Sequence, residues 1–139
     1  MSGFSDRFEY DILQLLLCAK PITNIADNAG SSPSTAIWVA LHTASPADDG
    51  TQGTNEVGLT AYTRIAVART TGGFVVTSGS SATKATASPV SAIDFPTLTS
   101  TSTGTATHAS LGLSSAATAG VIIAHGALSV AINLGQNVT

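Results

Sequence analysis

Charged side chains are scarce in this sequence. Asp, Glu, Lys and Arg make up 9% of the 139 residues and leave a net charge of −3, whereas an average globular protein is roughly 25% charged. The basic residues are spread along the chain and form no stripe: Arg7, Lys20, Arg64, Arg69 and Lys84. We therefore expect no nucleic-acid binding, because that function requires clustered positive charge to neutralise phosphates. A surface with so little charge has little self-repulsion, which is typical of a subunit that ends up in an assembly.

Cysteines and long apolar runs are also nearly missing. Cys18 is the single cysteine, so no disulfide can form within the chain and the fold does not depend on an oxidising compartment. The longest apolar stretch, residues 12–19, is interrupted by Gln14 and is far shorter than the roughly 20 residues that span a membrane. We expect neither a disulfide framework nor contact with a membrane.

The sequence also lacks the residues that would build a catalytic or cofactor site. His42, His108 and His125 have no His or Cys partner at metal-ligand spacing, so we interpret each as a hydrogen-bonded structural histidine. There is no phosphate-binding loop, dinucleotide fingerprint or serine-nucleophile elbow, and Glu56 and Asp94 are the only acids among the predicted strands. We predict a protein that is not an enzyme and binds no metal and no cofactor.

Thr, Ser and Gly are abundant instead, with 20 Thr, 17 Ser and 13 Gly. Thr favours strands, while Gly and Ser favour turns. An apolar stripe at three- and four-residue spacing predicts one helix over 5–20, which Pro21 stops. Alternating segments separated by turns predict about eight short antiparallel strands over 35–134. The expected fold class is all-β, a jelly roll or two-sheet β-sandwich with one N-terminal helix, in a single domain covering 1–139.

Some of the predicted strands carry particular expectations. Residues 35–43 are apolar on both faces, which favours a central strand with Trp38 in the core. The Gly72–Gly73 pair predicts a hairpin between the strands on either side. Towards the C-terminus the pattern predicts two further strands, over 120–128 and 129–135.

The longest polar segment between these strands is loop 44–58. A loop of this length in a compact domain is often functional or contacts a partner. Asp48 and Asp49, with Glu56 nearby, raise the alternative of a calcium site, but their spacing does not match an EF-hand loop. We interpret them as a solvated turn.

A series of short motifs, in matching order over about residues 36–134, resembles a family of tailed-bacteriophage virion structural proteins. In that family a strand ending in Leu-His-Thr is followed by a Pro/Asp/Gly loop, a Glu and a Tyr-x-Arg strand. An apolar strand ending in Phe-Pro, a Thr-x-Thr-His strand and a final His-Gly-x-Leu strand come later. The matching residues here are Leu41, His42, Thr43, Pro46, Asp49, Gly50, Glu56, Tyr62, Arg64, Ile93, Phe95, Pro96, Thr105, Thr107, His108, His125, Gly126 and Leu128. Within the family, the chain is most similar to capsid cement (decoration) proteins of short-tailed phages, including one that infects Bordetella.

The resemblance implies a non-catalytic capsid cement protein on the outer surface of the icosahedral shell, assembled in the bacterial cytoplasm. There it would clamp neighbouring subunits of the phage major capsid protein and self-associate as a dimer at two-fold positions. The alternative is a tail-fibre or spike-associated virion protein that binds a host surface ligand.

Loop 44–58, the N-terminal segment and the last strand are the expected contact surfaces. Aromatic residues and Arg dominate interface hot spots. The candidate protein–protein contact residues are Trp38, Pro46, Asp48, Asp49, Glu56, Tyr62 and Arg64. The alternative is that Tyr62 and Arg64 fix the loop internally, through a bond from Arg64 to Glu56.

Overall fold

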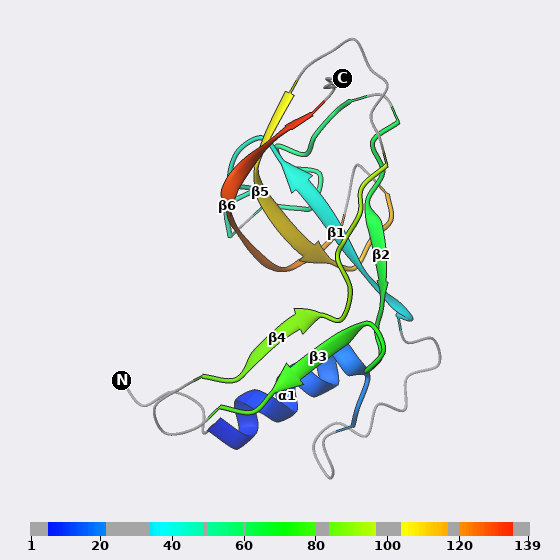
Figure 1. Ribbon diagram of the computed structural model, residues 1–139, viewed down its shortest axis with the longest axis vertical. Coiled ribbons are helices and arrows are strands. Elements are labelled where there is room, and N and C mark those ends of the chain that lie inside the picture. The colour runs from blue at the N-terminus through cyan, green and yellow to red at the C-terminus, as the bar shows by residue number, and fades with distance from the viewer. Residues whose placement is uncertain are drawn as a thin grey trace. The chain divides into compact units, whose positions relative to one another are not determined.

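The computed structural model describes residues 6–21, 34–48, 50–59, 61–79, 84–96, 104–116 and 120–134. One helix and six strands lie in these ranges (Figure 1), in the order α1 (Asp6–Cys18), β1 (Ala36–His42), β2 (Ile65–Ala68), β3 (Phe74–Thr77), β4 (Thr86–Pro89), β5 (Gly104–Gly112) and β6 (Ile122–Leu134). The strands form two antiparallel sheets, with the orders β2-β1-β5-β6 and β3-β4. The prediction of a β fold with one N-terminal helix is confirmed.

Two differences explain why the described residues contain six strands where the sequence predicts about eight. The two strands predicted over 120–128 and 129–135 are one continuous strand, β6, of 13 residues. Irregular pairing between β5 and β6 lets this strand bend without ending. The segment 90–96 forms no strand; it contributes the ring of Phe95, which stacks on Tyr62 with a centroid separation of 6.0 Å.

The chain divides into two compact units, Met1–Ala36 with Val67–Ala92, and Ile37–Ala66 with Ile93–Thr139. We call the first the helical unit and the second the sheet unit. The expectation of a single domain over 1–139 stays a prediction.

In the helical unit, α1 packs against β3 and β4. Phe74 on β3 is buried, and its carbonyl accepts a weak hydrogen bond from the Cys18 thiol at 3.7 Å. Burial raises the pKa of this thiol, which fits an inert structural cysteine. The Gly72–Gly73 turn is present, but the predicted hairpin is wrong, because β3 pairs with β4 rather than with β2. No helix among the described residues is long and apolar enough to cross a membrane.

The helix ends earlier than the predicted range 5–20, and its end has a clear physical cause. Ala19 adopts a left-handed conformation with φ of 54°, which stops α-helical geometry. The Arg69 guanidinium donates hydrogen bonds to the carbonyls of Leu16 at 2.5 Å and Leu15 at 2.6 Å. These carbonyls have no partner within the helix, so Arg69 both satisfies them and places positive charge at the negative end of the helix dipole.

In the sheet unit, β1 is central, as predicted, and pairs with β5 from Trp38↔Gly112 to His42↔His108. Its side chains are buried almost continuously from Ile37 to His42. The apolar core joins one residue each from β1, from loop 44–58 and from β5: Leu41, Val57 and Ala106. Partly buried apolar residues pack against this cluster: Leu59, Tyr62, Phe95, Ala109 and Leu128.

Candidate functional site

Loop 44–58 leaves the end of β1 and comes back to pair with the same end of that strand. His42 and Glu56 form an isolated antiparallel bridge. On either side of the bridge, Thr43 N–H donates to the Asn55 carbonyl at 2.8 Å, and Val57 N–H donates to the Leu41 carbonyl at 3.0 Å. The two ends of the loop are therefore held together by backbone hydrogen bonds.

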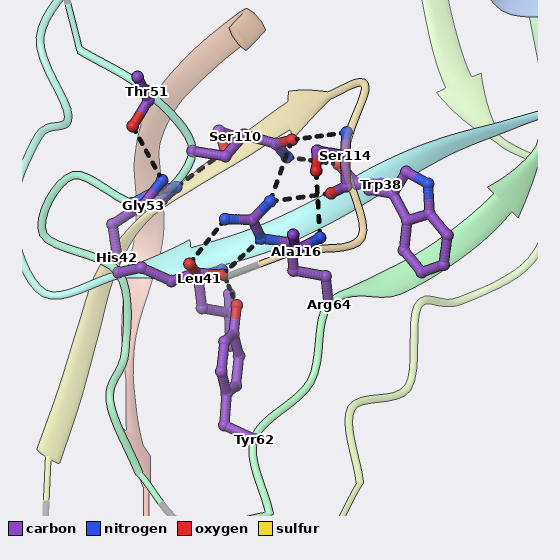
Figure 2. Close-up of polar contacts among 12 residues, drawn as sticks. Trp38, Leu41, His42, Thr51, Gly53, Tyr62, Arg64, Ser110, Ser114 and Ala116 are labelled. Carbon is purple, nitrogen blue, oxygen red and sulfur yellow. Dashed lines mark hydrogen bonds and ion pairs between the residues drawn. The ribbon is translucent and has the colours of Figure 1, made fainter. Parts of the chain in front are cut away.

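Arg64 anchors this returning segment from inside the sheet unit. Its Nε donates to Glu56 Oε1 at 2.7 Å and its Nη2 to Oε2 at 2.8 Å, the parallel geometry that makes Arg–carboxylate pairs strong. Its Nη1 donates to the Ser114 carbonyl at 2.8 Å (Figure 2). The Arg64 and Glu56 side chains are only 1% and 6% exposed, so this is a buried ion pair with its hydrogen-bonding groups engaged.

Gln52 connects this hydrogen-bond network to β1 and to the segment between β5 and β6. The residue is fully buried; its Nε2 donates to the Trp38 carbonyl at 3.0 Å, and its Oε1 accepts from the Ser114 N–H at 3.2 Å. The side chain fits because Gly112 lies beneath it: a Cβ at that position would fall on the Gln52 amide. The backbone N–H of Gln52 donates to the Gly120 carbonyl at 3.0 Å.

His42 forms a second polar group in the core. Its ring is fully buried, with Nδ1 2.9 Å from the Thr54 carbonyl oxygen and Nε2 2.8 Å from the Ser110 hydroxyl. Because a carbonyl can only accept, Nδ1 carries the proton and Nε2 accepts from Ser110. Burial lowers the pKa of His42, so the ring is neutral and ties loop 44–58 to β5.

Tyr62 completes the support of the loop. Its hydroxyl accepts the Leu41 N–H at 2.7 Å, and Figure 2 shows it pointing at that residue. Burial raises the pKa of Tyr62 well above its ordinary value, and the neighbouring carboxylate of Glu56 adds to this shift. The phenol therefore stays protonated and acts as a structural group.

A groove of about 660 Å³ lies where loop 44–58 meets the start of β6, and its lining residues are Asp48, Gly50, Thr51, Gly120, Val121, Ile122, Ile123, Ala124 and His125. The hydrogen bond from the Gln52 N–H to the Gly120 carbonyl joins its two walls. At the rim, His125 Nε2 lies 3.0 Å from Asp48 Oδ1. The buried network of Gln52 and Arg64 thus supports one wall of an open, solvent-facing site.

The predicted contact residues in and beside the core are engaged with each other. The bond from Arg64 to Glu56, proposed as the internal alternative, is present, and the hydroxyl of Tyr62 accepts the Leu41 N–H of β1. These three side chains hold loop 44–58 in place. That any of them also contacts another protein stays a prediction.

The remaining contact candidates lie in different environments. Trp38 is half-buried on β1 and Pro46 is buried in the loop. Asp48 is exposed at the rim of the groove, and Asp49 lies outside the described residues. Within the described part of the chain, no group of three or more His, Cys, Asp or Glu side chains could hold a metal ion.

Sequence reasoning missed the two residues that position the groove. Gln52 is a single polar residue in a polar loop and carries no sign that it would be buried. Gly120, with φ of +128°, stands in a Ser/Ala/Gly-rich segment that predicts only a turn. Glycine is required there for two reasons. Its positive φ is a conformation that other residues rarely adopt, and a Cβ at this position would lie only 2.8 Å from Gln52 Oε1.

Comparison with known proteins identifies the family to which the chain belongs. No curated protein and no solved structure matches the chain. A family model described as "Podophage GP4 fiber I protein gp80" matches residues 16–138, nearly the whole sequence. This description agrees with a non-catalytic structural component of a phage virion, and it supports the fibre alternative rather than the capsid cement prediction. The chain belongs to the podophage GP4 fiber I protein gp80 family of phage fibre proteins.

Proposed function

We propose that this fibre protein acts at the tail of the virion, as a fibre or spike-associated component that contacts a ligand on the host surface. The observation that carries the proposal is the match to a podophage fibre family over residues 16–138. The groove between loop 44–58 and β6 supports the proposal, because a ligand could bind in this open site.

The groove is suited to binding because its walls are held in place. Gln52 joins the two walls through its bond to Gly120, and its own side chain is held by Trp38 and Ser114. A site ordered in advance loses little conformational entropy when a ligand binds, so more of the contact energy appears as affinity.

The groove lining indicates how a ligand would be recognised. Asp48, Thr51 and His125 offer carboxylate, hydroxyl and imidazole groups, and Val121 to Ile123 form an apolar wall. Among the lining residues that the structure describes, there is no Lys, Arg, Phe, Tyr or Trp. Recognition would therefore depend on hydrogen bonds and apolar contact, rather than on aromatic stacking or on pairing with an anionic group. The volume falls within the roughly 300–1,000 Å³ range of ligand sites.

The location is tested by labelling purified virions with gold-conjugated antibodies against this chain. The proposal expects label at the tail. Label spread over the capsid, together with binding of the purified chain to shells of the major capsid protein, would contradict it and favour a cement role.

The groove is tested with fluorescently labelled chain and intact host cells. We expect the double variant Asp48→Ala/His125→Ala to bind about tenfold more weakly, which is the effect of losing about 1.4 kcal/mol of contact energy. Asp94→Ala is the matched control, because Asp94 is an exposed acid of the same unit outside the groove lining. Undiminished binding by a folded double variant would remove the groove from the proposal.

A further inference from the structure

β6 is the edge strand of the larger sheet, and its distal part is unusually exposed. Among the described residues, β5 is the only strand that pairs with β6. The five consecutive residues from Ser129 to Asn133 are all exposed, including Val130 at 76% and Ile132 at 42%. We call these residues the 129–133 segment.

This part of the sheet has little support from neighbouring strands. β1 pairs with β5 only from His108 to Gly112, so Gly104 to Ala106 pair with the end of β6 as a two-stranded ribbon. A two-stranded ribbon is only marginally stable in water and needs a further strand or a covering surface. One side is covered, because Ala106 is fully buried in the core cluster. No strand of the described part of the chain pairs with the outer edge of β6.

The usual devices that keep sheet edges from pairing are mostly absent here. Edge strands are normally short or carry charges or proline. β6 runs for 13 residues with neither a charged residue nor a proline: IIAHGALSVAINL. The one device present is irregular pairing, because the register with β5 shifts between Ala106↔Ile132 and His108↔Ala127.

The chemistry of the segment points to an identical strand as its partner. Its sequence Ser-Val-Ala-Ile-Asn is symmetric in character about Ala131: small in the centre, apolar on both sides and polar at the ends. Antiparallel pairing of two copies about Ala131 sets Val130 opposite Ile132 of the second copy and Ser129 opposite Asn133 of the second copy. Because the 129–133 segment carries no charge, two copies of it do not repel each other. A charged partner strand would find no side chain of opposite charge in this segment.

We propose that two copies of this chain associate through the 129–133 segments of their β6 strands, paired antiparallel about a two-fold axis at Ala131. The interface closes on itself, because a two-fold contact uses the same surface on both copies. The paired strands alone supply fewer residues than the 20–30 per side of a standard interface. The dimer is therefore weak and depends on concentration in free solution. This proposal is independent of the groove and of ligand binding.

Site-directed cross-linking tests the register. In a Cys18→Ala background, which removes the only native cysteine, Ala131→Cys places two thiols directly across the axis, within reach of a disulfide. Asn133→Cys is the matched control: its two thiols would be offset by four residues along the strands, about 13 Å. We expect mild oxidation to give mostly cross-linked dimer for Ala131→Cys and little for Asn133→Cys.

Sedimentation of the uncross-linked protein gives the second readout. The wild type should shift from monomer to dimer as its concentration rises, and Val130→Lys/Ile132→Lys should stay monomeric with unchanged Trp38 fluorescence. Val75→Lys, an exposed apolar position on β3 in the other unit, should dimerise like the wild type. Equal cross-linking at positions 131 and 133, a wild type that is monomeric at all concentrations, or open-ended assemblies would each overturn the proposal.

Discussion

The guanidinium of Arg64 and the carboxylate of Glu56 form two parallel hydrogen bonds, at 2.7 and 2.8 Å, inside the sheet unit. Glu56 pairs with the end of β1, and the same guanidinium also binds the Ser114 carbonyl. One buried ion pair thus connects the returning end of loop 44–58 with the segment that follows β5. The stability of the groove walls should depend on it.

We expect Glu56→Gln to lower the free energy of unfolding of the sheet unit by about 3–5 kcal/mol, because it leaves the buried Arg64 charge without its counter-ion. Urea denaturation followed by the fluorescence of Trp38, the only tryptophan, measures this directly. Asp48→Asn is the control: it removes an exposed carboxylate and should leave the denaturation midpoint nearly unchanged. Equal effects of the two substitutions would show that the buried pair has no special role.

Tyr62→Phe should destabilise the sheet unit by about 1–3 kcal/mol. The ring and its stacking on Phe95 are kept, but the Leu41 N–H loses its acceptor, and an unsatisfied buried donor carries a cost of this size. The same urea titration measures the loss. Tyr10→Phe is the control: it removes a hydroxyl from the helical unit and should not change the urea midpoint reported by Trp38. A Tyr62→Phe protein as stable as the wild type would mean that the Tyr62 hydroxyl is dispensable.

Gly112→Ala should disturb the network through sterics alone. The added methyl group would occupy the position of the Gln52 amide, and overpacking of this kind costs about 1–3 kcal/mol. Gly126→Ala on the neighbouring strand is the matched control, because a Cβ there meets no atom within 4 Å. We expect the first variant to lower the urea midpoint and the second to leave it unchanged. Equal midpoints for the two variants would show that Gln52 can move away without loss.

His42 should make the sheet unit less stable in mild acid. Its pKa is lowered by burial, so below the ordinary histidine value of roughly 6.5 the unfolded chain takes up a proton that the folded chain does not. The stabilisation is complete above about pH 6.5 and is lost as the pH falls towards the folded pKa, by up to about 1.4 kcal/mol per pH unit. Urea midpoints measured from pH 8 to 5 show this slope.

The slope is assigned to His42 by comparing two variants. His42→Gln should be less stable at every pH but should lack the acid-dependent loss. His125→Gln, at the rim of the groove, should keep it. Retention of the full slope in His42→Gln would assign the effect to another group.

The residue pattern predicted those parts of the fold that depend on local sequence. The apolar run in β1 predicted a buried central strand, and the helical stripe predicted α1. The end of that helix could not be read from its own residues, because it depends on Arg69, which lies far along the chain. Two strands were predicted over β6, divided between residues 128 and 129, yet pairing with β5 resumes beyond this point, after a register shift that depends on the partner strand.

The candidate site was only partly predictable for a related reason. The Arg64–Glu56 bond joins residues close in sequence and was foreseen as an alternative. The burial of Gln52 depends on the lack of a side chain at Gly112 and on an acceptor at Gly120. Each of these features is ordinary alone, and only the folded chain brings them together.

The central claim is that this chain is a fibre component of the virion, and the number of copies in each particle tests it most directly. Quantitative mass spectrometry of purified virions gives the molar ratio of this chain to the major capsid protein. We predict that the chain is present at a small fraction of the capsid protein's copy number. A ratio near one to one would contradict the fibre assignment and support a cement that covers the shell.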